Sequence, residues 1–345
     1  MKVSTPFDER GVALLITLLV VTLLTIIVVE FTYSTGVDAH LTRNFLSGAQ
    51  ARNLARSGIA LAELTLKRDA AAKSKSPPER PPIETLNDPW AQPFSPMPVA
   101  EGFGTVGFVI TDPSGLYNLN ALSVSIAAGP AQLEMRKTLF QGILAALDLD
   151  TNLIFPLLDW LDSDDEVSSD KGAESEYYLG LTPAHLPRNG RLLTFDELAL
   201  VKGFGPLTHE QWTGLRALVT VLPNADLRIN VNTAPELLLT AIFTALDHQG
   251  LGRTIVKDRE EHPFQKPDLD NLLNAYQVTG VARTIFDVRS SFFTIRAAGK
   301  AGDAERGLAV TEQLRREAVG RAGGKNPAAR NGAPRSGNFG SSIRP

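Results

Sequence analysis

The pattern of apolar and polar residues near the N-terminus predicts one long helix with two different halves. Residues 12–29 carry no charge, and their polar members are Thr17, Thr22 and Thr25. At 1.5 Å per residue, such a helix is just long enough to cross the hydrocarbon core of a bilayer. Farther along, residues at helical spacing form an amphipathic stripe. Its members are Val37, Leu41, Phe45, Gly48, Ala51, Ala55, Ile59, Ala62 and Leu66. We therefore expect a continuous helix from residue 12 to about 70, whose second half packs against a globular domain.

The rest of the chain predicts an α+β fold. Residues 73–98 are rich in Pro and Ser, which predicts a connecting loop. Candidate strands cover 104–111, 286–297 and 306–316, and candidate helices cover 130–147, 152–161, 194–202, 208–221, 233–247 and 268–275. Most helices lie between the first strand and the last two, so we expect a small antiparallel sheet interrupted by a large helical insert.

Composition and charge exclude some functions. The 345 residues include no cysteine, so disulfides, zinc–thiolate sites and cysteine nucleophiles are impossible. The net charge is −4, but residues 318–345 carry five basic residues and no acid, so the remainder carries −9. An acidic body argues against a general nucleic-acid binder. The basic tail is rich in Gly, Pro, Ser and Asn and is predicted to be disordered.

The residues before the apolar run form an unusual leader. A charged stretch, MKVSTPFDER, ends at Gly11, and the apolar run begins at Val12. In a secretory signal peptide the small residues follow the apolar run instead. The arrangement resembles the signal of type IV pilin-like proteins, which a prepilin peptidase would cut between Gly11 and Val12. The alternative is an uncut signal anchor.

Ile16 is an informative departure from this resemblance. Most pilins and major pseudopilins carry Glu five residues after the cut, where it is thought to neutralise the N-terminal ammonium of a neighbouring subunit. Here that position is Ile16. A buried carboxylate needs such a partner. A subunit at the tip of a filament has no subunit above it and could dispense with the Glu.

Several longer segments resemble the minor pseudopilin K family of the type II secretion system, also called general secretion pathway protein K. They are DPSGLYNLNAL (112–122), LLDWLDSDDE (157–166), GAESEYY (172–178), FDELALVKGF (195–204), INVNTAPELL (229–238) and SSFFTIRA (290–297). With the leader, the resemblance runs from about residue 10 to 316. It implies a pilin-like fold in which a helical domain interrupts the sheet.

The resemblance also implies an organisation and a function. The expected parts are a cleaved leader (1–11), a transmembrane segment (12–30), a pilin-like helix with loop and first strands (31–120), a helical insert domain (121–275), closing strands (276–317) and the basic tail (318–345). The implied function is to initiate or cap the type II secretion pseudopilus at its tip, without catalysis. The implied partners are minor pseudopilins of the I and J types, the pseudopilus and the prepilin peptidase. The chain would cross the inner membrane once, with its C-terminal domain in the periplasm, and bind no nucleic acid.

An acidic cluster is the candidate metal site. Its members are Asp159, Asp162, Asp164, Asp165, Glu166, Asp170, Glu174 and Glu176. Dense carboxylates suit Ca²⁺, which takes six to eight oxygen ligands. Val167 and Ala173 occupy the positions where an EF-hand counted from Asp162 needs Gly and Glu, so the cluster is not an EF-hand. The composition alone also fits a solvated acidic loop. Since members of the K family bind calcium in this domain, the resemblance favours a structural Ca²⁺ site, with these predicted ligands: Asp162, Asp164, Asp170 and Glu174.

Two further patterns have a structural and a functional interpretation. The Asn pairs in NLNAL (118–122) and NVNTA (230–234) favour helix caps or turns over catalysis. Residues 198–215 are similar to a helix-hairpin-helix, which in DNA-binding proteins offers backbone N–H groups to phosphate. This segment lies in an acidic region, and Lys202 is the only nearby cation in its turn, so packing is the favoured interpretation. Two alternative functions remain open. One is a membrane-anchored periplasmic enzyme with an uncut signal anchor, and the other is a DNA-uptake pseudopilin that uses the hairpin turn.

Overall fold

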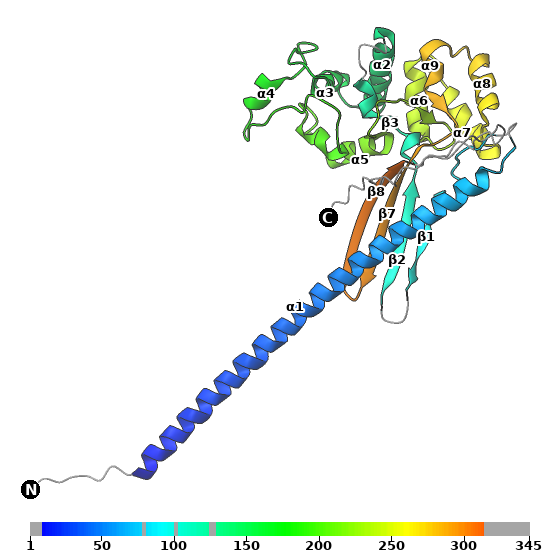
Figure 1. Cartoon of the computed structure of the whole chain (residues 1–345). Helices are drawn as coiled ribbons and strands as arrows, with labels where there is room; N and C mark the ends of the chain where they lie inside the picture. The colour runs from blue at the N-terminus through cyan, green and yellow to red at the C-terminus, as the bar shows by residue number, and fades with distance from the viewer. Residues whose placement is uncertain (1–8, 78–80, 100–102, 124–128, 314–345) are drawn as a thin grey trace, which may run out of the picture. The chain divides into compact units, whose positions relative to one another are not determined.

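The computed structural model describes residues 9–77, 81–99, 103–123 and 129–313 of the chain (Figure 1). These residues form two compact units. One contains residues up to 59 together with 95–107 and 297–308, and the other contains 60–94, 108–296 and the residues from 309. The predicted basic tail and residues 1–8 of the leader lie outside the described residues. The predicted domain boundaries remain predictions.

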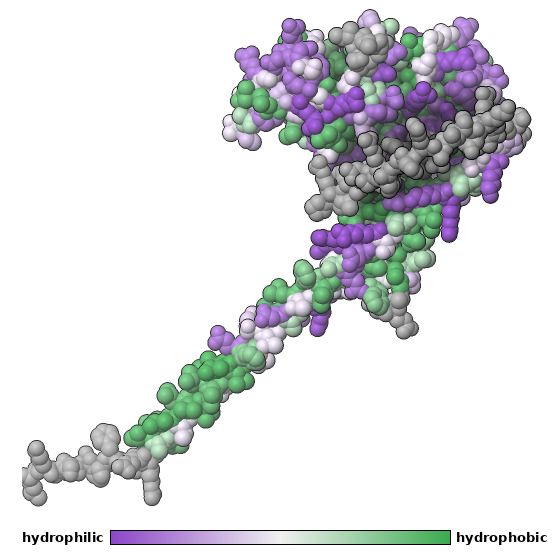
Figure 2. All heavy atoms as spheres, viewed as in Figure 1, coloured by the Kyte–Doolittle hydropathy of each residue, from purple (hydrophilic) through white to green (hydrophobic). Residues whose placement is uncertain are grey.

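The predicted long helix is present as α1 (Glu9–Lys73), an unbroken helix of 65 residues. Its first part is apolar, as Figure 2 shows, and the side chains of residues 12–46 are exposed. The hydroxyls of Thr22 and Thr25 donate 2.8 Å hydrogen bonds to the carbonyl oxygens of Leu18 and Val21, one turn earlier. These polar groups are thus satisfied inside the helix, as a lipid environment requires.

The amphipathic stripe of α1 is buried from Gly48 onward. In the first unit, Ala51 and Leu54 form a small core with Ala301. A Cβ added at Gly299 would lie 2.2 Å from the carbonyl oxygen of Ala51, so this strand requires glycine where it meets the helix. The earlier stripe residues Val37, Leu41 and Phe45 remain exposed.

The main sheet has four strands in the order β1-β2-β7-β8. Their bounds are β1 (Phe94–Pro98), β2 (Thr105–Thr111), β7 (Phe292–Ala301) and β8 (Ala304–Gln313). The two-residue connection between β7 and β8 makes them an antiparallel hairpin. The connecting loop predicted over 73–98 is wrong at its end, because residues 94–98 form β1 at the sheet edge, where Pro96 and Pro98 are tolerated. The α+β class is confirmed.

The residues between β2 and β7 form the predicted helical insert. Its α-helices are α2 (Pro130–Ala146), α3 (Ile154–Leu161), α4 (Ser175–Leu179), α5 (His209–Leu218), α6 (Glu236–Ala245), α7 (Leu251–Glu261), α8 (Lys266–Ala275) and α9 (Gly280–Thr284). The short 3₁₀ helices of the second unit are η1 (Pro89–Ala91), η2 (Pro113–Gly115), η3 (Leu119–Leu122), η5 (Thr151–Leu153) and η6 (Phe195–Leu200). A continuous apolar core fills this domain.

Two sequence predictions in this domain need correction, and one helix was not predicted. The segment predicted as a helix over 194–202 is the 3₁₀ helix η6. The single strand predicted over 286–297 is divided into β6 (Phe286–Asp287) and β7. Helix α7 was missed because its buried face is narrow: Leu251, Gly252 and Ile255 are buried, while six of its eleven residues are charged.

The helical domain contains two halves with the same framework. In the first half, β3 (Tyr117–Asn118) pairs in parallel with β4 (Val219–Thr220). In the second half, β5 (Ile229–Asn230) pairs in parallel with β6. Each half therefore begins with a two-residue strand, continues through helices and returns to pair beside its start.

The two Asn pairs hold these halves in the same way. Asn120 accepts a hydrogen bond from the backbone N–H of Leu192 and donates one to its carbonyl, at 2.8 and 2.9 Å. Asn232 makes the same two bonds with Phe264, at 2.9 and 3.0 Å. The first Asn of each pair accepts from the backbone N–H two residues later. The structural interpretation of these asparagines is thus confirmed.

We expect Asn232→Ala to lower the free energy of unfolding by about 1–3 kcal/mol, because it leaves the buried backbone groups of Phe264 without a partner. Chemical unfolding of the full chain in detergent measures this. Asn271→Ala, at an exposed position of α8, is the matched control and should change little. An Asn232 variant as stable as this control would contradict the assignment.

Candidate functional site

The acidic loop between α3 and α4 brings three carboxylates together. Asp159 lies in α3, Asp162 follows its last residue, and Glu174 precedes α4. One oxygen atom from each of these three residues lies within 4.8 Å of the others. Three carboxylates this close repel one another unless protons or a cation screen them.

Asp159 is the fixed member of the group. It is fully buried, and its carboxylate accepts hydrogen bonds from the backbone N–H groups of Ser168 at 2.9 Å and Ala173 at 2.6 Å. A Cβ added at Gly172 would lie 2.1 Å from an Asp159 oxygen, so the loop can close over this carboxylate only with glycine there. The Asp159 carboxylate therefore holds the backbone of the acidic loop in place through these hydrogen bonds.

Asp162 and Glu174 have oxygen atoms without protein partners. Glu174 is only 4% exposed, and neither of its carboxylate oxygens accepts a hydrogen bond. The Oδ1 atom of Asp162 is also buried and accepts none. Burial, and then the charges of Asp164 and Asp159, raises the pKa of Asp162 to about 6. Burial, and then Asp159 and the neighbouring aspartates, raises the pKa of Glu174 to about 7. An orphaned buried carboxylate indicates a missing partner, and a cation meets that need.

The sequence prediction and the geometry agree on two of the four predicted ligands, Asp162 and Glu174. Asp170 is outside the group of three: its side chain is 81% exposed and pairs with Lys171 at 3.3 Å. Asp164 is also outside it and accepts from the backbone N–H of Glu166 at 3.0 Å. Sequence analysis did not choose Asp159 as a ligand. The sequence feature that could have indicated Asp159 is its position as the one carboxylate within the apolar segment LLDWL.

The donor set fits a hard divalent cation. All three residues offer carboxylate oxygen, which suits Ca²⁺ better than softer metals. Asn189 adds a buried amide oxygen without a hydrogen-bond partner, and its amide nitrogen donates to the carbonyl oxygen of Asp164 at 2.9 Å. Bound to these oxygens, a cation would neutralise the repulsion and cross-link the two ends of the loop.

Lys202, the cation of the hairpin-like segment, hydrogen-bonds to the backbone of the acidic loop. Its Nζ donates to the carbonyl oxygens of Gly172 at 2.8 Å and Lys171 at 3.3 Å. Its ammonium also lies 4.8 Å from the centre of the Tyr177 ring. The half-buried side chain thus binds the acidic loop, which favours packing over phosphate binding.

The predicted processing site lies at the start of α1. Gly11 is within the helix, and the side chains of Val12 and Ile16 are exposed. By length and composition α1 could cross a membrane, and among the described residues it is the one helix that meets this test. Cleavage at this site remains a prediction.

A long N-terminal helix that is apolar at its start and buried against a small sheet farther on defines a pilin-like subunit. The helical domain inserted between β2 and β7 distinguishes it within that class. The family model described as type II secretion system, protein K, matches residues 115–224. Type II secretion system protein K of Pseudomonas aeruginosa is 32% identical over 264 residues, which are 75% of this chain and 75% of the relative. The chain belongs to the type II secretion system protein K family.

Other comparisons agree with this membership. Type II secretion system protein K of Aeromonas hydrophila is 28% identical over 309 residues, covering 86% of this chain and 90% of the relative. Among solved structures, a chain of the GspK-GspI-GspJ complex from enterotoxigenic Escherichia coli matches with a TM-score of 0.58 and 20% identity. The match covers 80% of this chain and 92% of that one and supports the fold.

Proposed function

We propose that this chain is a minor pseudopilin anchored in the inner membrane by α1, at the tip of the type II secretion pseudopilus. The single observation that carries the proposal is the contrast along α1. Residues 12–46 have exposed side chains, whereas the stripe from Gly48 onward is buried. An exposed apolar helix of this length needs lipid or other helices around it.

The partners of this helix are proposed to be minor pseudopilins of the I and J types. The GspK-like neighbour was solved in a complex with GspI and GspJ. In this chain Val37, Leu41 and Phe45 continue the buried stripe of α1 but are exposed, so they suit contact with partner helices. Co-isolation from membranes tests this: the full chain should carry I-type and J-type subunits with it. Its isolation without them, after mild detergent extraction, would contradict the proposal.

The tip position predicts a cost for Ile16→Glu. An added carboxylate would enter the helix bundle without a subunit above to supply its ammonium partner. We expect the variant to be processed normally but to reduce secretion roughly tenfold, in line with the penalty for a buried unpaired charge. Secretion assays on the variant measure this, with Ile16→Leu as the control. Undiminished secretion by the Glu variant would contradict the tip placement.

The acidic site is proposed to hold structural Ca²⁺, with Asp159, Asp162 and Glu174 supplying oxygens. The orphaned carboxylate oxygens of Glu174 support this. When bound, the ion supplies charge neutralisation and a cross-link between α3 and α4. The basis for a non-catalytic role is the family, which is a component of a secretion system.

The pH dependence of calcium binding follows from the raised pKa values of Asp162 and Glu174, at about 6 and about 7. Without metal, the folded state keeps protons that the unfolded state has released, so the free energy of unfolding falls as pH rises from about 4 to 7. Protons also compete with calcium, and we expect its affinity to fall about 100-fold between pH 7.5 and 5.5. Titration calorimetry at both pH values measures this. An affinity independent of pH would contradict the ligand assignment.

A further inference from the structure

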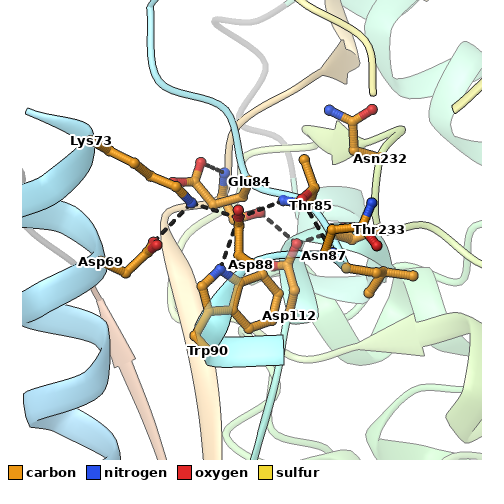
Figure 3. A network of polar contacts seen from close by, with 12 residues as sticks. Asp69, Lys73, Glu84, Thr85, Asn87, Asp88, Trp90, Asp112, Asn232 and Thr233 are labelled. Atoms are coloured by element: carbon orange, nitrogen blue, oxygen red, sulfur yellow. Dashed lines mark hydrogen bonds and ion pairs between the residues drawn. The ribbon is translucent and has the colours of Figure 1, made fainter. Parts of the chain in front are cut away.

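The C-terminal end of α1 carries a buried group of charges. The ammonium of Lys73 lies 2.8 Å from an Asp69 oxygen, 2.5 Å from Asp88 and 3.8 Å from Glu84 (Figure 3). The Lys73 side chain is 15% exposed, and the three acidic side chains are no more exposed than 16%. The Lys73 ammonium therefore faces three carboxylates where little water can screen them. We name these four residues the Lys73 cluster.

Asp88 fastens the segment that follows α1. Besides Lys73, the same Asp88 oxygen accepts hydrogen bonds from the backbone N–H of Thr85 at 2.8 Å and the indole N–H of Trp90 at 3.1 Å. Trp90 is buried and packs edge-on against Phe293 of β7, with ring centres 5.0 Å apart. Residues 84–91 thus form a strap that is pinned to α1 at one side and to the sheet at the other.

Glu84 connects the cluster to the second half of the helical domain. Its backbone N–H donates to Val288 and its carbonyl accepts from the Asn230 side chain, both at 3.0 Å. Its carboxylate accepts from the backbone N–H of Ser290, also at 3.0 Å. Glu84 is 1% exposed and therefore contacts three elements from a buried position: α1, strand β5 and the segment that leads into β7.

The network continues to Asp112, just before η2. Its carboxylate accepts from the hydroxyls of Thr233 at 2.6 Å and Ser290, and from the backbone N–H of Ser114 at 2.8 Å. The Asn230 side chain also donates to Ser290, at 2.8 Å. Burial raises the pKa of Asp112 above its usual range. Four segments far apart in the sequence therefore meet through buried polar groups.

Such a network is an inefficient way to gain stability. Desolvating charges is costly, and apolar replacements of buried ion pairs are often neutral or stabilising. A buried polar network does, however, favour one arrangement, because any displacement leaves charges unpaired. We propose that the Lys73 cluster is a rigid joint that couples the end of α1 to the second half of the helical domain, so that a displacement of α1 is passed into that domain rather than absorbed by the strap. The inference rests on these contacts and does not depend on the proposed function.

Hydrogen exchange of the full chain in detergent tests the joint. Lys73→Met removes this ammonium from the three carboxylates. We expect amide exchange in residues 66–76 and 84–91 to become at least about 10-fold faster, with α6 unchanged as the internal reference. Unchanged exchange in the two segments would overturn the proposal. An equal acceleration in α6 would also overturn it, because that result indicates general destabilisation.

Lys67→Met is the matched control. Lys67 also lies in α1 and pairs with an acid one turn earlier, Glu63, but its side chain is 70% exposed. It should leave exchange in all three segments unchanged. Should Lys73→Met fail to fold, Asp88→Asn provides the same test, because it removes one charge yet keeps an oxygen for Thr85 and Trp90. We expect amide exchange to become about threefold faster in residues 66–76 and 84–91 and to stay unchanged in α6. Unchanged exchange in the two segments would overturn the proposal.

Discussion

Calcium is expected to raise the free energy of unfolding of this protein by about 2.7 kcal/mol when its free concentration is 100 times the dissociation constant. The reason is that only the folded chain brings Asp159, Asp162 and Glu174 within 4.8 Å of one another. A bound ion would relieve the repulsion among them and would supply the partner that the Glu174 oxygens lack. Chemical unfolding of the full chain in detergent, with calcium and with a chelator, measures the difference.

Variants separate the site from the rest of the acidic loop. Asp162→Asn combined with Glu174→Gln should abolish the calcium effect and stabilise the metal-free protein, because two repelling charges are lost. Asp196→Asn is the control, since Asp196 is exposed and pairs with Arg216 outside the loop. Asp170→Asn decides between the ligand set predicted from the sequence and the geometric group. Loss of the calcium effect with Asp170→Asn would favour the sequence-based set.

Replacement of Gly11 is expected to have the largest functional effect. The resemblance to pilin-like signals places the cut after Gly11, and a side chain there would obstruct the peptidase. We expect Gly11→Val to retain its leader and to reduce secretion to the level of a strain without the protein. Immunoblotting for the processed form and an assay for exported protein measure the two effects.

Gly36→Val is the matched control for this substitution. Gly36 also lies in α1, and a Cβ there would meet no atom within 4 Å. The control chain should be processed at the normal rate. Normal processing of Gly11→Val would contradict recognition of Gly11 by the prepilin peptidase.

The parts of the fold governed by regular spacing were predictable from the sequence. The stripe Gly48, Ala51 and Ala55 indicated which face of α1 would be buried, and the structure confirms it. The paired asparagines indicated local side-chain to backbone bonds, which Asn118 and Asn230 confirm, because each accepts from the backbone N–H two residues later. In these cases the physical cause is local or periodic, so the sequence contains it.

Features that depend on distant contacts were not predictable. The sequence placed Asp159 in the acidic cluster without singling it out, and only the folded loop shows that Ala173 and Ser168 donate to it. Nothing in the sequence near Lys73 indicated that Glu84 and Asp88 would gather around it. Strand β1 was hidden by its prolines, whose tolerance depends on a position at the sheet edge.

The mature N-terminus tests the central claim most directly. Mass spectrometry of the protein from membranes, with and without the prepilin peptidase, would identify its first residue. A start at Val12 that depends on the peptidase is the predicted result and would establish processing as a pseudopilin. A start at Met1 in both strains would contradict the account.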